Sequence, residues 1–179
     1  VVLIPVLGDL GDTVSVDLKL DNRDGPYVGG LQVSVKVNDL SRASIIAIED
    51  TNQVDHFTVS HVQTDSVAHF IIFSTSGDSI APNPVDTLTC LATLKILIKG
   101  PDEGGAATRG DFVDLDVFNV LAGNPQGSPL DADDRDGRLF VGIRCDTNFD
   151  GQINILDIIN LIRNIVNNTL PDANTTGFV

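Results

Sequence analysis

The chain has 179 residues, which is enough for one sizeable domain with an appendage or for two small domains. Its formal charge of −14 and its pI near 4.2 exclude nucleic acid as an expected partner, because phosphate backbones need clustered Lys and Arg. Nearly all of the acid is Asp, which favours turns and metal loops over long helices. No apolar run approaches the length of a membrane span.

The sequence contains no Met, so we expect Val1 to follow a removed signal peptide or to lie inside a longer precursor. Either origin fits a protein that is extracellular or located at the cell surface.

From Val1 to residue 143 the pattern is that of a mainly β domain. Val14, Val16, Leu18 and Leu20 alternate with polar residues, and a turn rich in Asp and Gly follows. Leu31 to Val37 alternates in the same way. Further candidate strands, separated by Gly, Pro, Asn and Asp clusters, are 44–49, 56–62, 67–74, 88–98, 112–121 and 138–143. Many short strands without helical periodicity predict an antiparallel sandwich or barrel.

The chain has two cysteines, Cys90 in the 88–98 run and Cys145 just after the β-type region. They are compatible with one disulfide in an exported protein, and two reduced thiols are the alternative.

A twelve-residue loop pattern begins directly after Cys145. Oxygen-bearing residues occupy the positions that calcium loops use, Gly151 stands at the sharp turn, and Gln152 offers its backbone carbonyl. The expected calcium ligands are Asp146, Asn148, Asp150, Gln152, Asn154 and Asp157. The alternative is a polar turn that caps a helix without binding metal.

Residues 155–166 follow with a helical pattern in which eight of twelve residues are apolar. We expect Ile153 and this apolar stripe to form an interface, with the contributing residues Ile153, Ile155, Leu156, Ile158, Ile159, Leu161, Ile162 and Ile165. The tail to Val179 carries two glycosylation sequons, at Asn167 and Asn174.

These residues resemble a known pair of protein families. The segment Asp-x-Asn-x-Asp-Gly-x-Ile-Asn-x-x-Asp with Leu161 and Arg163 resembles one dockerin repeat. The β-type region resembles a cohesin, the partner that dockerins bind, through the segments 11–14, 28–32, 73–80 and 136–141. The resemblance implies a non-catalytic jelly-roll β-sandwich over 1–143 and a calcium-binding loop–helix with its tail over 144–179. Because dockerins normally carry two repeats and this chain shows one, we describe the second part as a half-dockerin.

The resemblance also implies that the protein builds assemblies with protein partners. A lone helix cannot bury its own apolar stripe, so it must pack on another molecule or on its own sandwich. Docking on a second copy would give a head-to-tail contact and an open filament or array. A Cys90–Cys145 bridge would favour packing of the helix on its own sandwich.

Other candidate sites are weaker. Asp131, Asp133, Asp134 and Asp136 form an acidic cluster that predicts a turn or a second calcium site. The alternating Asp111, Asp114 and Asp116 are expected to face solvent. The three histidines lie near no nucleophile motif, so we do not expect an enzyme.

The alternative function is a carbohydrate-binding module, or a scaffolding fragment of a polysaccharide-degrading complex. Sugar platforms usually rely on exposed Trp or Tyr, however, and the chain has no Trp and only Tyr27. Its eight Phe residues are expected mostly in the core.

Overall fold

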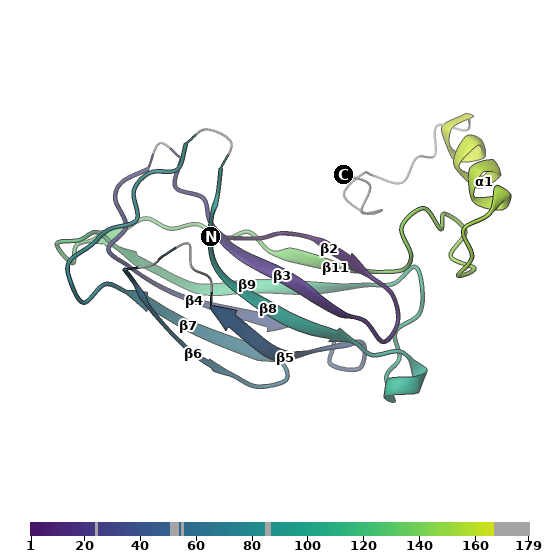
Figure 1. Ribbon diagram of the computed structural model, residues 1–179, viewed down its shortest axis with the longest axis horizontal. Coiled ribbons are helices and arrows are strands. Elements are labelled where there is room, and N and C mark those ends of the chain that lie inside the picture. The colour runs from purple at the N-terminus through teal and green to yellow at the C-terminus, as the bar shows by residue number, and fades with distance from the viewer. Residues whose placement is uncertain (24, 51–53, 55, 85–86, 167–179) are drawn as a thin grey trace.

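The computed structural model describes residues 1–23, 25–50, 54, 56–84 and 87–166. Two β-sheets pack face to face, and one helix stands beyond one end of them (Figure 1). Four strands form the smaller sheet, in the order β1 (Val2–Leu3), β3 (Thr13–Leu20), β8 (Thr89–Ile98) and β5 (Ala43–Asp50).

The larger sheet contains seven strands. Its order is β2 (Val6–Gly8), β11 (Gly137–Val141), β9 (Phe112–Gly123), β4 (Gly30–Val37), β7 (Val67–Phe73) and β6 (Thr58–Gln63), and β10 (Pro129–Leu130) pairs with the end of β9. All pairings are antiparallel except that of β2 with β11. A short 3-10 helix, η2 (Pro101–Glu103), follows β8, and α1 (Ile155–Val166) follows β11.

The chain passes back and forth between the two sheets as it runs from β3 to β9, except that the consecutive strands β6 and β7 pair with each other in the larger sheet. The strands β3, β5 and β8 belong to one sheet, whereas β4, β6, β7 and β9 belong to the other. Each crossover therefore joins the sheets across the core, as expected for a jelly-roll sandwich. Every strand longer than three residues was predicted from the sequence, and the mainly β sandwich is confirmed.

The core lies between the sheets and consists of the inward residues of each alternating strand. In β4 these are Leu31, Val33, Val35 and Val37, all at most 4% exposed. Strand β8 departs from strict alternation, because Leu91 is completely buried between buried neighbours. A β-bulge causes the departure: Leu18 and Lys19 of β3 face Ala92 and Cys90, so Leu91 is the extra residue.

The short strands β1, β2 and β10 were not predicted. Each has only two or three residues, so no periodicity can reveal it. The chain leaves β1 at Ile4 and Pro5 and changes sheets before β2, where it pairs with β11 instead of β3.

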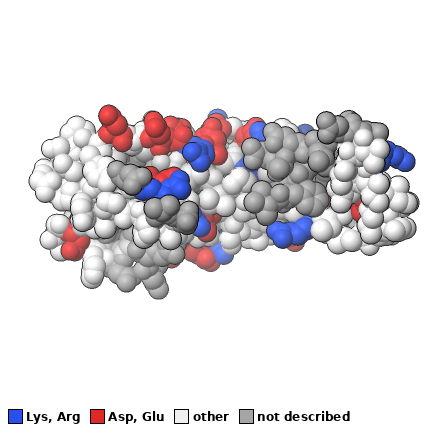
Figure 2. Space-filling view, turned by 90° about the horizontal axis from the view of Figure 1, so that it is seen from above, with Lys and Arg blue, Asp and Glu red and all other residues white. Residues whose placement is uncertain are grey.

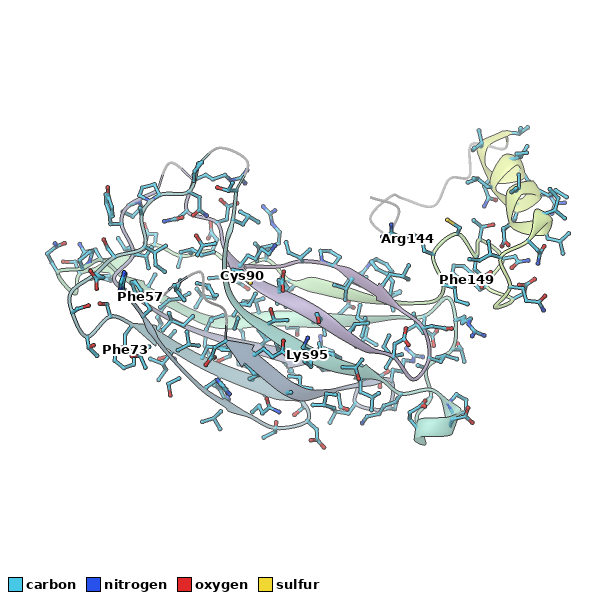
Figure 3. All side chains as sticks on the ribbon, viewed as in Figure 1. Phe57, Phe73, Cys90, Lys95, Arg144 and Phe149 are labelled. Atoms are coloured by element: carbon cyan, nitrogen blue, oxygen red, sulfur yellow. The ribbon has the colours of Figure 1, made fainter. Side chains whose placement is uncertain are left out.

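The Cys90–Cys145 bridge is not formed, and both residues are thiols. Cys90 pairs with Lys19 near one end of β8, whereas Cys145 follows Gly142, whose amide donates to Gly8 beside Ile98 at the other end. The eight steps from Cys90 to Ile98 span about 26 Å, and a disulfide requires Cα atoms within about 7 Å. Figure 3 shows Cys90 well away from Arg144, the neighbour of Cys145.

The Phe residues are less buried than the sequence predicted. Phe70 and Phe140 are buried, but Phe73, Phe112 and Phe149 are between 38% and 48% exposed. The aliphatic side chains of Val, Leu and Ile fill most of the core instead. Within the described residues no helix is long and apolar enough to cross a membrane.

Shortening a core side chain tests this packing. Phe70→Ala should lower the free energy of unfolding by about 3–5 kcal/mol, because Phe70 has no exposed surface and its loss leaves a cavity. Val62→Ala, at a position that is 69% exposed, is the control and should change it by less than about 0.5 kcal/mol. Urea denaturation of both variants measures the difference, and equal effects would contradict the described core.

Candidate metal loop and docking helix

The predicted calcium loop, residues 146–157, leaves the sandwich after β11 and leads into α1. Phe149 and Gly151 have left-handed backbone conformations, with φ of 59° and 84°. Gly151 adopts this conformation without steric cost, whereas Phe149 does so at a cost of about 1–2 kcal/mol. The surrounding hydrogen bonds must therefore hold Phe149 in place.

Two carboxylates form the interior of the loop. Asp146 and Asp157 are each only 3% exposed. Asp146 accepts backbone N–H groups from Asp150 at 3.2 Å and from Gly151 at 2.8 Å. Asp157 accepts from Thr147 and Asn154, both at 2.8 Å. The two side chains thereby fold the chain around themselves, and hydrogen bonds from Asn154 and Thr147 keep the pKa of Asp157 below its usual range.

The same residues also cap α1. Asn154 Oδ1 accepts the N–H of Leu156 at 2.8 Å, and Asp157 Oδ2 accepts the N–H of Asn154. Asn154 is thus the N-cap residue, and the arrangement is a variant of the capping box in which its side chain accepts from the second helical residue while the third, Asp157, bonds back to its amide. The loop therefore caps a helix, as the alternative interpretation predicted, and capping is compatible with metal binding by the same oxygens.

The donor set suits a hard cation that prefers oxygen. The side chains of Asp146, Asn148, Asp150, Asn154 and Asp157 all carry oxygen, and each carboxylate has lone pairs beyond those that its N–H donors use. No three His, Cys, Asp or Glu side chains within the described residues are arranged to hold a metal, so amide and backbone oxygens would have to complete the coordination. With that condition the loop fits Ca²⁺, and the ligand set stays a prediction.

The apolar residues of α1 face solvent. Every predicted interface residue, from Ile153 to Ile165, is between 37% and 63% exposed. Figure 1 shows α1 projecting from the end of the sandwich rather than lying on a sheet. In the view of Figure 2 the end that carries α1 is mostly uncharged, with basic side chains at its tip and beside it, whereas most of the visible acidic side chains lie over the other half of the molecule. Packing of this stripe on the chain's own sandwich is therefore not observed among the described residues.

The loop itself does contact the sandwich, through sandwich residues that belong to no motif recognisable in the sequence. Arg109 donates two hydrogen bonds to Asp9, both at 2.8 Å, and its guanidinium lies against Gly151. A Cβ atom built on Gly151 would stand 2.5 Å from Arg109 Nη1. The hydrogen bond to Asp9 raises the pKa of Arg109, to which Asp146 contributes as a nearby negative charge.

Phe149 makes the second contact with the sandwich. Its ring lies over Gly110 and Gly142, where built Cβ atoms would stand 3.4 Å and 3.7 Å from ring carbons. Gly110 precedes β9 and Gly142 follows β11, so both mark the end of the larger sheet. Figure 3 shows Phe149 at this end, with the loop between it and α1.

An exposed apolar patch lies on the outer face of the larger sheet, which we call the outer patch. Gln32 of β4 is flanked by Leu121 of β9 and Ile71 of β7, which are 64% and 52% exposed. Phe73 and Val62 extend the patch along β7 and β6. The interspersed side chains Gln32, Ser60 and His69 carry no carboxylate.

The other acidic clusters have structural partners. Asp136 Oδ1 accepts the Val117 N–H at 2.7 Å, and the Asp133 carbonyl accepts the amino group of Val1. The 131–136 cluster is thus a connecting loop between β10 and β11, as the turn interpretation predicted. On β9, Asp114 pairs with Arg138 at 2.8 Å, and Asp116 accepts from Asn38 at 2.6 Å.

The histidines do not form a catalytic group. His69 Nδ1 lies 2.7 Å from Ser34 Oγ, which resembles two members of a catalytic triad. Ser34 is only 1% exposed, however, so its hydroxyl is closed to substrate. His61 Nδ1, on β6, lies 3.6 Å from Asp50 Oδ1 on β5 of the other sheet. The prediction of a satisfied structural histidine describes His69 well. The sequons at Asn167 and Asn174 lie outside the described residues.

No protein-family model and no curated protein matches the sequence. Several solved structures share its fold. A chain of the type I cohesin–dockerin complex Coh-OlpC–Doc435 from Clostridium thermocellum is 19% identical, with a TM-score of 0.61 over 78% of this chain and 90% of that chain. A non-cellulosomal cohesin from the hyperthermophilic archaeon Archaeoglobus fulgidus is 11% identical, with a TM-score of 0.60 over 80% of this chain and 90% of that one.

The cohesin CaCohA2 from Clostridium acetobutylicum is 20% identical, with a TM-score of 0.54 over 78% of this chain and 87% of that one. Together these likenesses establish a cohesin-like fold. They do not test the dockerin-type character of the loop and α1, which stays a prediction.

The Asp9–Arg109 pair gives a pH-dependent prediction. The hydrogen bond from Arg109 holds the pKa of Asp9 below its usual range. A carboxyl with a lowered pKa in the folded state stabilises that state above its unfolded pKa, about 3.9, and loses this contribution as the pH falls through the folded value. Asp9→Asn should therefore cost about 1 kcal/mol at pH 7, a value kept small because the pair is partly exposed.

Urea denaturation at a series of pH values measures this effect. The difference between Asp9→Asn and the unsubstituted protein should vanish in acid. A difference that persists at the lowest pH would show that Asp9 acts through packing instead of charge.

Proposed function

We propose that the protein is a non-catalytic building block of an extracellular assembly, in which α1 of one molecule docks on the sandwich of the next. The observation that carries the proposal is the exposed apolar stripe of α1, held away from its own sandwich. The cohesin-like fold supports it, because several neighbours of this fold were solved in complex with dockerins.

Burial of the stripe supplies the driving force. Full burial of a Leu or Ile side chain contributes roughly 1.5–3 kcal/mol, and the eight predicted interface side chains are between 37% and 63% exposed. Only part of this reaches the binding free energy, since association costs translational and side-chain freedom. An uncovered stripe of this size is a typical protein-interaction surface.

We propose the outer patch as the receiving surface. It spans β9, β4, β7 and β6, three strand spacings or about 14 Å, and α1 is about 18 Å long. The two surfaces are apolar and carry little charge, so the net charge of −14 does not oppose their contact locally. Their dimensions match those of one helix on one sheet face.

The position of the patch favours docking between molecules. Leu121 lies nine residues along β9 from Phe112, or about 30 Å from the end that carries the loop. Figure 3 shows Phe73 and Phe149 at opposite ends of the sandwich. Because α1 is shorter than this distance and points away from the strands, it cannot cover the patch of its own chain. A contact between opposite ends is head-to-tail and generates an open array unless its rotation closes a ring.

Calcium binding completes the proposal. Asp146, Asn148, Asp150, Asn154 and Asp157 would bind the ion through side chains, and Gln152 through its carbonyl. A bound Ca²⁺ would supply positive charge that offsets the two carboxylates buried in the loop. Folding of the loop and α1 is then linked to metal concentration, as in other small metal-dependent segments.

The calcium linkage is tested by removing one buried ligand. Asp146→Ala should abolish calcium uptake by titration calorimetry and remove the calcium-dependent rise in melting temperature. Asp102→Ala, in the exposed η2 turn, is the control and should keep both. Calcium uptake by the Asp146→Ala variant equal to that of the unsubstituted chain would place the ion elsewhere.

The docking contact is tested with two complementary variants. Ile158→Asp with Ile162→Asp disables the helix, and Ile71→Asp with Leu121→Asp disables the outer patch. Light scattering in millimolar calcium should find each variant monomeric, because each lacks one half of the contact. The mixture should form dimers and nothing larger, since each pair keeps one intact contact and has no means to extend it.

Ile46→Asp, at an exposed position of β5 in the other sheet, is the control and should assemble like the unsubstituted chain. A mixture that stays monomeric would contradict head-to-tail docking through these surfaces.

A further inference from the structure

We propose that Phe149 and Arg109 are positioning residues that fix the direction of α1 relative to the sandwich, and thereby the angle between successive molecules. The inference rests on the proposed docking role of α1. It concerns the joint between the loop and the sandwich, which the loop motif by itself does not require.

The first half of the joint is the contact of Phe149 with two glycines. Its ring lies over Gly110 and Gly142, which close the larger sheet at this end. Both glycines have positive φ, 93° and 159°, and neither has a side chain that would hold the ring away. Phe149 is 48% exposed, so one face of the ring meets the sandwich while the other faces solvent. The ring is therefore seated on backbone, which leaves little freedom to shift.

The second half is Arg109. Its two hydrogen bonds to Asp9, on the segment after β2, hold the guanidinium flat at 2.8 Å from each carboxylate oxygen. Gly151 then approaches this plane so closely that a Cβ atom at this position would force the guanidinium to shift. The two contacts lie two residues apart in the loop, so they fix its orientation as well as its position.

The orientation passes from the loop to α1 without a flexible link. Asn160, in the second turn of α1, donates to the Thr147 carbonyl at 2.7 Å. The Thr147 hydroxyl donates to the Asp157 carbonyl at 2.8 Å, and the Asp157 side chain accepts from the Thr147 and Asn154 amides. The loop and the first two turns of α1 thus move as one body, and the joint to the sandwich sets where that body points.

The joint and the proposed metal ligands share one stretch of backbone. Phe149 lies between Asn148 and Asp150, and its left-handed φ of 59° aims the ring at the sandwich. The Asp150 N–H, which follows it, is held by Asp146 at 3.2 Å and by Asn148 at 3.0 Å. Ligands that bind an ion would hold the same conformation, so metal loading of the loop should stiffen the joint.

A fixed joint has a consequence for assembly. When each molecule presents its helix at one angle to its receiving face, repeated contacts generate a regular array with a constant turn per molecule. A loose joint would give the same contacts but a flexible chain. Phe149 and Arg109 would therefore determine the shape of the assembly without taking part in the docking interface.

The test removes the ring and keeps the loop backbone. Asn tolerates the left-handed conformation, so Phe149→Asn should leave the calcium dissociation constant within about threefold of its original value. Spin labels at Ile46→Cys and Arg163→Cys report the direction of α1, in a chain with Cys145→Asn and with the outer patch disabled so that it stays monomeric. In calcium the distribution of distances between the two spin labels should be narrow in the chain that retains Phe149. It should become roughly twice as broad in the Phe149→Asn variant.

Phe149→Tyr should restore the narrow distribution, and Tyr27→Asn, which removes a 55% exposed ring elsewhere, should not broaden it. Distance distributions of equal width in the chain with Phe149 and in the Phe149→Asn variant would overturn the inference. A broad distribution in the chain that retains Phe149 would overturn it as well. Calorimetry separates the two proposals: if the chain takes up no calcium, the proposed metal site fails, and the comparison of the two widths still decides whether Phe149 positions α1.

Discussion

The two carboxylates buried in the 146–157 loop are the constraint on which the rest of the C-terminal part depends. Asp146 and Asp157 have almost no exposed surface, and backbone N–H groups of their own loop surround them. A charge so enclosed must be compensated, and hydrogen bonds from Thr147, Gly151 and Asn154 do part of this. The loop that results begins α1, directs it and leaves its apolar stripe in solvent. The proposed calcium site and the proposed docking helix are thus two aspects of one folded segment.

The sandwich and the C-terminal loop with α1 are stabilised by different interactions. The core of the sandwich consists mainly of Val, Leu and Ile side chains between the two sheets, and its buried cluster includes no residue of the loop or of α1. The loop and α1 have no core of their own, so their order depends on polar contacts and on Phe149. A sandwich that is folded without calcium, joined to a docking helix whose order depends on calcium, would allow the assembly to respond to calcium while the sandwiches stay folded.

The contacts at the joint also limit the alternatives. Docking of α1 on its own outer patch would require the segment to cross about 30 Å of sheet, and Phe149 and Arg109 hold it at the opposite end. Two of the exposed Phe rings, Phe73 and Phe149, lie at opposite ends of the sandwich (Figure 3), so they do not form one sugar platform. Association between molecules accounts for both the exposed stripe of α1 and the exposed outer patch.

The sequence by itself determined the strands, the order of the two parts and the position of the loop, because alternation and ligand spacing are local properties of the chain. The strands β3 to β9 and α1 follow directly from side-chain periodicity. The tertiary structure decided what local patterns cannot express. It placed Cys90 near one end of β8 and Cys145 beyond the other end, so that they form no bridge. It also inserted Leu91 as a β-bulge and packed the Phe149 ring on Gly110 and Gly142. These outcomes depend on which distant residues become neighbours, and that is fixed only when the two sheets pack.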